Sequence, residues 1–166
     1  MKQLYMMVGL PGSGKSYYAE KLADSLNYCK GELVRVVSRD KIRFSMLKDD
    51  ENYFKHETEV FNKYVEVIQA SLNSVAINAV VADATHLNET SRNKLLDRLD
   101  LTDVEVVPIF IYTPYEECLQ RNATRQGRAY VPEKAIRNMA YSLTEPTYNE
   151  KHKYSNIITI KEGEVL

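Results

Sequence analysis

Hydrophobic positions along the chain change period repeatedly, and this pattern predicts strands and helices in turn. Five short runs are apolar at most positions, which is typical of β-strands buried in the middle of a protein. The predicted strands are Gln3–Gly9, Leu33–Ser38, Ile77–Asp83, Val104–Thr113 and Asn156–Ile160. Their apolar character indicates a sheet that is covered on both faces.

The segments between these runs carry apolar residues at helical spacing. Tyr18, Leu22 and Leu26 recur every four residues and therefore share one helical face. The predicted helices are Lys15–Leu26, Glu57–Ser74, Asn88–Leu99, a helix that begins at Tyr115, and Glu133–Leu143. Alternating strands and helices predict a three-layer α/β fold, with a mainly parallel five-stranded sheet and helices on both faces. Two polar segments, Lys48–His56 and Asn122–Tyr130, interrupt the pattern and are expected to form binding loops or lids.

Length, charge and cysteine content narrow the class of protein. The 166 residues are 44% hydrophobic and carry a net charge of −1, which suits one domain spanning residues 1–166. The balanced charge disfavours a protein that coats duplex nucleic acid, but it is compatible with a local basic groove. Cys29 and Cys118 lie too far apart for a zinc motif. No apolar stretch approaches the roughly 18 residues of a membrane span, so we expect a cytoplasmic protein with no membrane partner.

The first strand leads directly into the string GLPGSGKS, which fits the phosphate-binding pattern G-x-x-x-x-G-K-[ST]. Glycines allow successive backbone amides to point inward, and the following helix directs its positive end at the same place. Lys15 is expected to reach the terminal phosphates of a nucleotide, and the Ser16 hydroxyl to bind Mg²⁺. The residues predicted to bind the nucleotide in this loop are Gly9, Pro11, Gly12, Ser13, Gly14, Lys15 and Ser16.

The remaining sequence favours ATP as the nucleotide, with Mg²⁺ as the metal. A guanine-binding N-K-x-D string is absent at the correct spacing: the nearest candidate, residues 93–97, reads NKLLD and lies in a helical pattern. A motor protein would usually be longer. A kinase is therefore expected, and the acceptor side of the site must be sought elsewhere in the chain.

The string SRDKIR follows the second predicted strand and supplies candidate acceptor residues. Residues just beyond the carboxyl end of a parallel strand face the ligand crevice. Asp40 is expected to accept a proton from an attacking hydroxyl, while Arg43 shares its helical face and, with Arg39, holds the acceptor. Alternatively, Asp40 caps the next helix and the basic residues are simply solvated.

The third predicted strand ends in an acid, Asp83, which is the arrangement in which a carboxylate supports Mg²⁺, often through water. The alternative is that Asp83 only ends the strand. His86 follows three residues later and either touches the acceptor or caps the turn at Leu87 and Asn88.

Arginines in the second polar segment predict a lid over about residues 121–131. Arg121 and Arg125 lie one helical turn apart, so both can face the same way, and Gly127 permits a sharp exit. Arginines on a mobile segment can close over phosphates and stabilise charge during transfer. A solvated basic helix end is the competing interpretation.

Taken in order, these motifs resemble the P-loop kinase family that contains phage-type 5′-polynucleotide kinases and zeta-toxin-like kinases. The strings that carry the resemblance are GLPGSGKS, SRDKIR, DATHLN…R and RNATRQGRAYVP. The resemblance implies that Asp40 is the general base, that Arg43 grips the acceptor's phosphate, and that the arginines of RNATR contact the donor phosphates. Thr85 and His86 of the DATHLN string are the further acceptor candidates. Ala84 separates Asp83 from Thr85, unlike the phage enzyme, which leaves open whether Asp83 serves the metal or the acceptor.

The sequence therefore predicts an ATP-dependent kinase whose acceptor is the 5′-hydroxyl of a DNA or RNA end. Basic residues around the second strand could steer a phosphodiester backbone into the crevice; they are Arg35, Arg39, Lys41 and Arg43. A kinase of a small metabolite, such as a nucleoside or an amino sugar, is an alternative that the balanced charge mildly favours. A nucleotide-dependent interaction module without catalysis is a third possibility.

Overall fold

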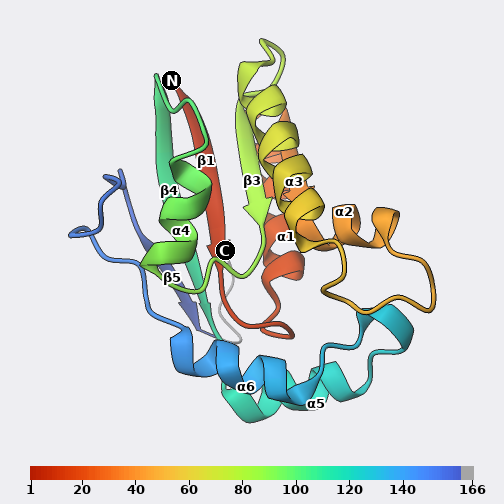
Figure 1. Cartoon of the computed structure of the whole chain (residues 1–166). Coiled ribbons are helices and arrows are strands. Elements are labelled where there is room, and N and C mark those ends of the chain that lie inside the picture. The colour runs from red at the N-terminus through yellow and green to blue at the C-terminus, as the bar shows by residue number, and fades with distance from the viewer. Residues whose placement is uncertain (162–166) are drawn as a thin grey trace.

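A five-stranded parallel sheet forms the centre of the protein (Figure 1). The computed structural model describes residues 1–161. The strands are β1 (Lys2–Val8), β2 (Val34–Ser38), β3 (Ala79–Asp83), β4 (Val104–Tyr112) and β5 (Ile158–Lys161). Their order across the sheet is β2-β3-β1-β4-β5, which places the strand before the glycine-rich loop in the middle.

The helices connect the strands and cover both faces of the sheet. They are α1 (Lys15–Lys30), α2 (Arg39–Met46), α3 (Glu57–Asn73), α4 (Glu89–Leu96), α5 (Tyr115–Ala123) and α6 (Glu133–Ser142), with a short 3₁₀ turn, η1 (Gly127–Ala129), before α6. Alternate residues of β1 point to opposite faces: Leu4 and Met6 pack with α3 and α4, while Tyr5 and Met7 pack on the side of α1. The predicted three-layer α/β fold is confirmed.

Local interactions set the end of α1 and the start of α2, and α4 ends at Leu96 rather than at the predicted Leu99. The first helix continues past Leu26 to Lys30, because it ends only where Gly31 adopts a left-handed conformation (φ 63°) and donates its amide to Asn27. The second begins at Arg39 because the Ser38 side chain caps it, accepting a hydrogen bond from the Lys41 amide at 3.2 Å. Ser38 therefore fills the capping role that Asp40 could have taken.

Parallel strands bring their carboxyl ends to one edge of the sheet, and the functional segments gather there. Ser38 lies opposite Asp83 in the register of β2 and β3, so the segments that follow both strands start side by side. Helices α2, α5 and α6 surround this edge (Figure 1). Within residues 1–161, no helix combines the length and apolar character needed to cross a membrane.

Candidate active site

The glycine-rich loop leaves β1 with a conformation that only glycine adopts easily. Gly12 and Gly14 have φ angles of 80° and 96°, both in the left-handed region. A Cβ atom on Gly12 would lie 2.7 Å from the carbonyl oxygen of Cys118, so the loop also packs too closely on α5 for any side chain there. These glycines let the chain turn sharply into the N-terminus of α1.

One side chain of the loop itself and two from distant segments hold the loop in place. Lys15 donates from Nζ to the Leu10 carbonyl at 2.9 Å, and Thr113 donates from Oγ1 to the Ser13 carbonyl at 2.7 Å. Arg121 donates from Nη1 to the Gly12 carbonyl at 3.1 Å. The Ser13 hydroxyl is buried and finds no partner among the described residues, and the start of α1 presents a positive helix end. These features fit an anionic group such as a nucleotide phosphate.

A serine and an aspartate meet at the start of α1, in the position expected for Mg²⁺ binding. The Ser16 hydroxyl donates to Oδ2 of Asp83 at 2.7 Å. Hydroxyl and carboxylate oxygens are ligands that Mg²⁺ accepts, with phosphates and water completing its shell, so these residues fit the metal. Burial raises the pKa of Asp83, although the nearby Lys15 charge opposes that shift. Burial lowers the pKa of Lys15, and the charge of Arg125 acts in the same direction.

Asp40 lies at the start of α2 in a network of hydrogen bonds with Arg43 and Tyr53. Tyr53 donates to Oδ1 of Asp40 at 2.6 Å, and Nη1 of Arg43 contacts the same oxygen. Arg43 Nη1 also donates to the Tyr53 hydroxyl at 2.7 Å, and its guanidinium lies 4.2 Å from the centre of the Tyr53 ring. About half of the Asp40 side chain stays exposed, so the carboxylate is oriented and still accessible.

Glu57, the first residue of α3, holds two arginines beside this carboxylate. Its Oε1 accepts from Nε of Arg43 at 2.8 Å, and its Oε2 accepts from Nη2 of Arg39 at 3.2 Å. The Arg43 side chain is almost fully buried (6% exposed), so this pairing compensates for the loss of water around its charge. Glu57 therefore fixes both cations at the edge of the cleft.

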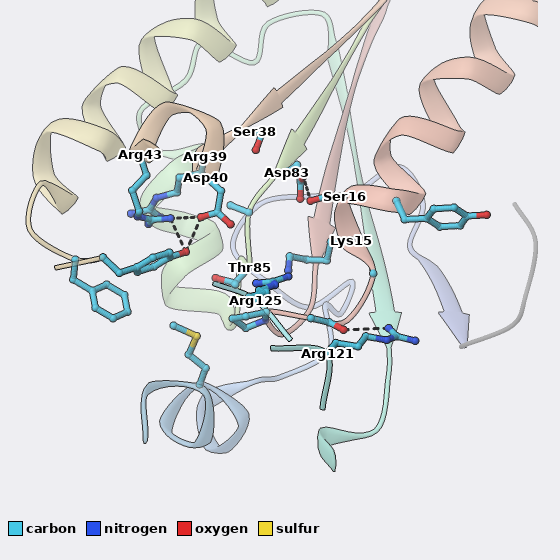
Figure 2. Close-up of a pocket in the computed structure, with 18 of the residues that line it drawn as sticks. Lys15, Ser16, Ser38, Arg39, Asp40, Arg43, Asp83, Thr85, Arg121 and Arg125 are labelled. Carbon is cyan, nitrogen blue, oxygen red and sulfur yellow. Dashed lines mark hydrogen bonds and ion pairs between the residues drawn. The ribbon is translucent and has the colours of Figure 1, made fainter. Parts of the chain in front are cut away.

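A cleft of about 330 Å³ contains the glycine-rich loop, Asp40 and Asp83 together. The candidate residues that line it are Pro11, Gly12, Gly14, Lys15, Ser16, Arg39, Asp40, Arg43, Asp83, Thr85, Arg121 and Arg125. In Figure 2, Asp40 and Arg43 lie on one side of the cleft, with Lys15 and Arg125 near its centre and the Ser16–Asp83 pair above them. Gly9 and Ser13 support the loop from outside the lining.

The structure does not bring His86 to the cleft. Its ring is buried, with Nδ1 at 2.5 Å from the Met7 carbonyl and Nε2 at 3.2 Å from the Tyr64 hydroxyl. Burial lowers its pKa to about 3, so the ring is neutral at physiological pH. The neighbouring cap of α4 is Asn88, which accepts from the Ser91 amide at 3.0 Å. His86 thus links β1 to α3.

The predicted lid combines the end of α5 with the loop before α6. Arg121 pairs with Glu117 at 2.7 Å as well as with the Gly12 carbonyl, whereas Arg125 lines the cleft from the loop. Buried Asn122 closes the base of this loop, because its side chain both donates to the Val131 carbonyl (2.7 Å) and accepts from the Val131 amide (3.0 Å). The loop is therefore held at its base by Asn122 and Val131, and Arg125 lies between these two residues in the chain.

Several residues at or behind the site were not predicted from the sequence. Tyr53 falls in the polar segment expected to be a binding loop, but nothing in its local pattern indicates a contact with Asp40. Glu57 reads only as the first residue of a helix. Arg92 is the arginine of the DATHLN…R string, and in the structure it pairs inside the protein with Glu150, 58 residues away. Asn122 gave no signal beyond its place in the lid.

Residues 4–146 match the AAA_33 family, described as an AAA domain. The chain belongs to this family. The match begins within β1 and extends through β2, β3 and β4, together with the glycine-rich loop, Asp40, Asp83 and the predicted lid. No curated protein matches the sequence.

Solved structures with the same fold include proteins of several kinds. Kti12 from Chaetomium thermophilum in complex with ADP-AlF3 superposes with a TM-score of 0.72 at 13% identity, covering 96% of this chain and 89% of Kti12. A fungal RNA kinase gives a TM-score of 0.66 at 11% identity, covering 99% and 76% of the two chains. A sugar kinase from Janibacter gives 0.61 at 15% identity, covering 97% and 85%. These likenesses confirm the predicted P-loop kinase fold.

Proposed function

We propose that this protein is an ATP- and Mg²⁺-dependent kinase that phosphorylates the 5′-hydroxyl end of a DNA or RNA strand. One observation carries the proposal. An accessible carboxylate, Asp40, shares a cleft with Lys15 of the glycine-rich loop, and two arginines stand beside that carboxylate. A phosphoryl donor and a hydroxyl acceptor can therefore meet within one cleft.

Each side of the cleft has a distinct role in the proposed reaction. The amides of the loop, Lys15, Arg121 and Arg125 bind the phosphates of ATP, and Ser16 and Asp83 support the metal. Mg²⁺ neutralises negative charge on the transferred group when it is bound. Asp40 accepts the proton of the attacking 5′-hydroxyl, whose oxygen forms the new bond to the γ-phosphorus while ADP leaves.

The surroundings of Asp40 favour a nucleotide end over a simple sugar. Arg39 and Arg43 offer two cations for a phosphodiester close to the attacking hydroxyl. Tyr53 and Phe54 also line this side of the cleft, with their rings 4.8 Å apart and edge to face, and Phe54 is partly exposed. Aromatic side chains beside cations are typical of sites for single-stranded nucleic acid.

The likeness to a fungal RNA kinase agrees with this assignment. The likeness to a sugar kinase keeps a small-metabolite kinase as the second candidate, because a compact acceptor could also reach Asp40. We further propose that residues 1–166 form one kinase domain, of which 162–166 lie outside the described residues, with residues 121–131 as its lid.

Incubation with γ-labelled ATP, Mg²⁺ and a single-stranded oligonucleotide bearing a 5′-hydroxyl is expected to label the oligonucleotide. The same strand with a 5′-phosphate should stay unlabelled, because it has no attacking group. DNA and RNA versions of one sequence, together with a pool of nucleosides and sugars, identify the acceptor. Lys15→Met serves as the control protein, since it removes the cation nearest the expected phosphates.

Absence of label from both polymers in the presence of Mg²⁺ would reject the proposal. Label in the nucleoside and sugar pool instead would support the second candidate. Nucleotide binding without any phosphorylated product would indicate a nucleotide-dependent interaction module.

Tyr53→Phe is expected to lower kcat about tenfold, the loss typical of removing one hydrogen bond to a charged group. The KM for ATP should change less than twofold, because Tyr53 lies on the Asp40 side of the cleft. The phenyl ring can remain under the Arg43 guanidinium, so the substitution removes only the hydroxyl. Steady-state kinetics measure both values, and an unchanged kcat would show that Tyr53 does not position Asp40.

A further inference from the structure

Three cationic side chains surround one buried aromatic ring next to the cleft. Phe61, in the second turn of α3, is only 7% exposed. Lys94 Nζ lies 4.6 Å from the centre of its ring, and the guanidinium carbons of Arg39 and Arg98 lie at 5.3 Å and 5.8 Å. We call Arg39, Lys94 and Arg98 the Phe61 cation cluster.

The Phe61 cation cluster extends the basic side of the cleft along the protein surface. Arg39 lines the cleft beside Asp40, whereas Lys94 and Arg98 project from α4 and the turn that follows it. Helices α3 and α4 both cover the same face of the sheet, and residues of both pack into one core there. Lys94 and Arg98 are both exposed and lie over the same ring as Arg39, so they extend the positive charge of the cleft across Phe61.

Acidic side chains leave much of this charge uncompensated. Glu57 is the only carboxylate that pairs with the cluster among residues 1–161, and it divides its oxygens between Arg39 and Arg43. The nearby acid Asp97, which follows the last residue of α4, instead contacts Lys151 and His152, each at 2.7 Å. Arg98 has a neutral partner, the Asn62 side chain at 3.3 Å, and the buried Nε of Arg39 has no partner within the described part of the chain.

Placing three like charges around one ring is unfavourable unless the ring and an anion offset their repulsion. The ring supplies part of that offset through cation–π attraction. An acceptor with one phosphate could be held by Arg39 and Arg43 alone, which would leave Lys94 and Arg98 without a ligand. A strand with several phosphodiesters can use all of these cations, and such strands bind to grooves that combine positive charge with aromatic side chains.

We propose that the Phe61 cation cluster binds the phosphodiester backbone of the acceptor strand beyond its terminal nucleotide. The inference rests on the proposed function and deepens it, since it makes the preferred acceptor a strand of several nucleotides rather than a mononucleotide. Phosphoryl transfer to the 5′-hydroxyl occurs at Asp40, while Lys94 and Arg98 increase the affinity for the strand without touching the reacting hydroxyl.

The double variant Lys94→Met/Arg98→Met tests the cluster, because methionine keeps an unbranched apolar side chain over the Phe61 ring and removes the charge. Fluorescence anisotropy with a 3′-labelled 12-nucleotide strand should show a Kd about tenfold higher than that of the unmodified protein. Each phosphate contact to a single strand contributes about 0.7 to the slope of log Kd against log salt concentration. Loss of two contacts should therefore reduce that slope by about 1.4. The KM for a nucleoside 3′-monophosphate should change less than twofold.

The matched control is Lys30→Met/Lys153→Met, which removes the same net charge from exposed positions at the end of α1 and before β5. Its salt slope should equal that of the unmodified protein. Equal loss of strand binding in both double variants would overturn the proposal, because it would show an effect of net charge alone. An unchanged salt slope together with a lowered Tm in Lys94→Met/Arg98→Met would also overturn it, because it would show that these side chains stabilise the fold by covering Phe61 and do not bind the strand.

If the double methionine variant does not fold, the single variants Lys94→Gln and Arg98→Gln each should reduce the slope by about 0.7. The outcomes also separate this inference from the proposed function. Strand binding that depends on the cluster without any label transfer would reject only the kinase assignment. If label is transferred but the KM for the strand depends neither on strand length nor on Lys94 and Arg98, only the role of the Phe61 cation cluster would be rejected.

Discussion

Replacing Asp40 with asparagine is expected to lower kcat for phosphoryl transfer by about 10²- to 10⁴-fold, the usual contribution of a general base. Asparagine has nearly the same shape, and its side-chain oxygen can still accept hydrogen bonds from Tyr53 and Arg43. It cannot take the proton of the attacking hydroxyl. The KM for ATP and the Kd for the strand should each change less than threefold, because the loop residues and the arginines remain in place.

Single-turnover measurements with excess enzyme isolate this effect from product release. Asp50→Asn is the matched control, since Asp50 is an exposed acid in the segment between α2 and α3 and does not line the cleft. Its kcat should equal that of the unmodified protein. A decrease of only a few-fold for Asp40→Asn would mean that Asp40 orients the acceptor without accepting its proton.

Local sequence was sufficient to place the glycine-rich loop, which forms the proposed donor side of this site. The loop between β1 and α1 needs positive φ angles at Gly12 and Gly14, and only a few residue types allow such a turn. The residues of this loop are therefore consecutive in the sequence, and a local motif is enough to find them. The place of Asp40 was also predictable, because a residue that follows a parallel strand must lie at the carboxyl edge of the sheet.

The surroundings of the acceptor side were not predictable from local pattern, because they are made by tertiary packing. Tyr53 and Glu57 reach Asp40 and Arg43 only because the segment after α2 folds back over them. The choice between Asp40 and Ser38 as the helix cap could not be made from the string SRDKIR, since both residue types are good caps. The structure gives this role to Ser38 and leaves the Asp40 carboxylate accessible.

Burial explains why His86 was hard to interpret. A histidine after a strand can reach a ligand or pack inside, and its own neighbours in sequence do not distinguish the two. Here Met7 and Tyr64 enclose the ring, and they come from β1 and α3. The backbone of His86 also has a positive φ of 41°, and its carbonyl accepts from Nη1 of Arg92 at 2.9 Å.

Arg92 and Glu150 form a buried ion pair that connects α4 to the segment after α6. Nε and Nη2 of Arg92 each donate to one oxygen of Glu150 at 2.8 Å, and the arginine side chain is fully buried. Tyr154 and the Thr147 amide also donate to the carboxylate, each at 2.9 Å. Burial opposes the charged form of Glu150, but these hydrogen bonds outweigh it and hold its pKa below the usual value.

Arg92→Met is expected to reduce the free energy of unfolding by about 3–5 kcal/mol, because it leaves the Glu150 charge buried without a partner. Glu150→Gln should also destabilise the protein, because it leaves the buried Arg92 charge without an anion and places an amide NH2 against hydrogen-bond donors. The double variant Arg92→Met/Glu150→Leu should be more stable than Arg92→Met, because it removes both buried charges. Urea unfolding near pH 7 measures these differences. Arg137→Met, which breaks an exposed pair with Glu133, is the control and should change stability little.

The pH dependence gives an independent test of the same pair. Because the pKa of Glu150 is lower in the folded protein than in the unfolded chain, its contribution is complete above its unfolded pKa of about 4.3 and is lost as the pH falls below that value. The unmodified protein should therefore lose more stability than Glu150→Gln between pH 6 and pH 3. Parallel losses in the two proteins, or an Arg92→Met variant as stable as the unmodified protein, would show that this pair does not anchor the segment after α6 to α4.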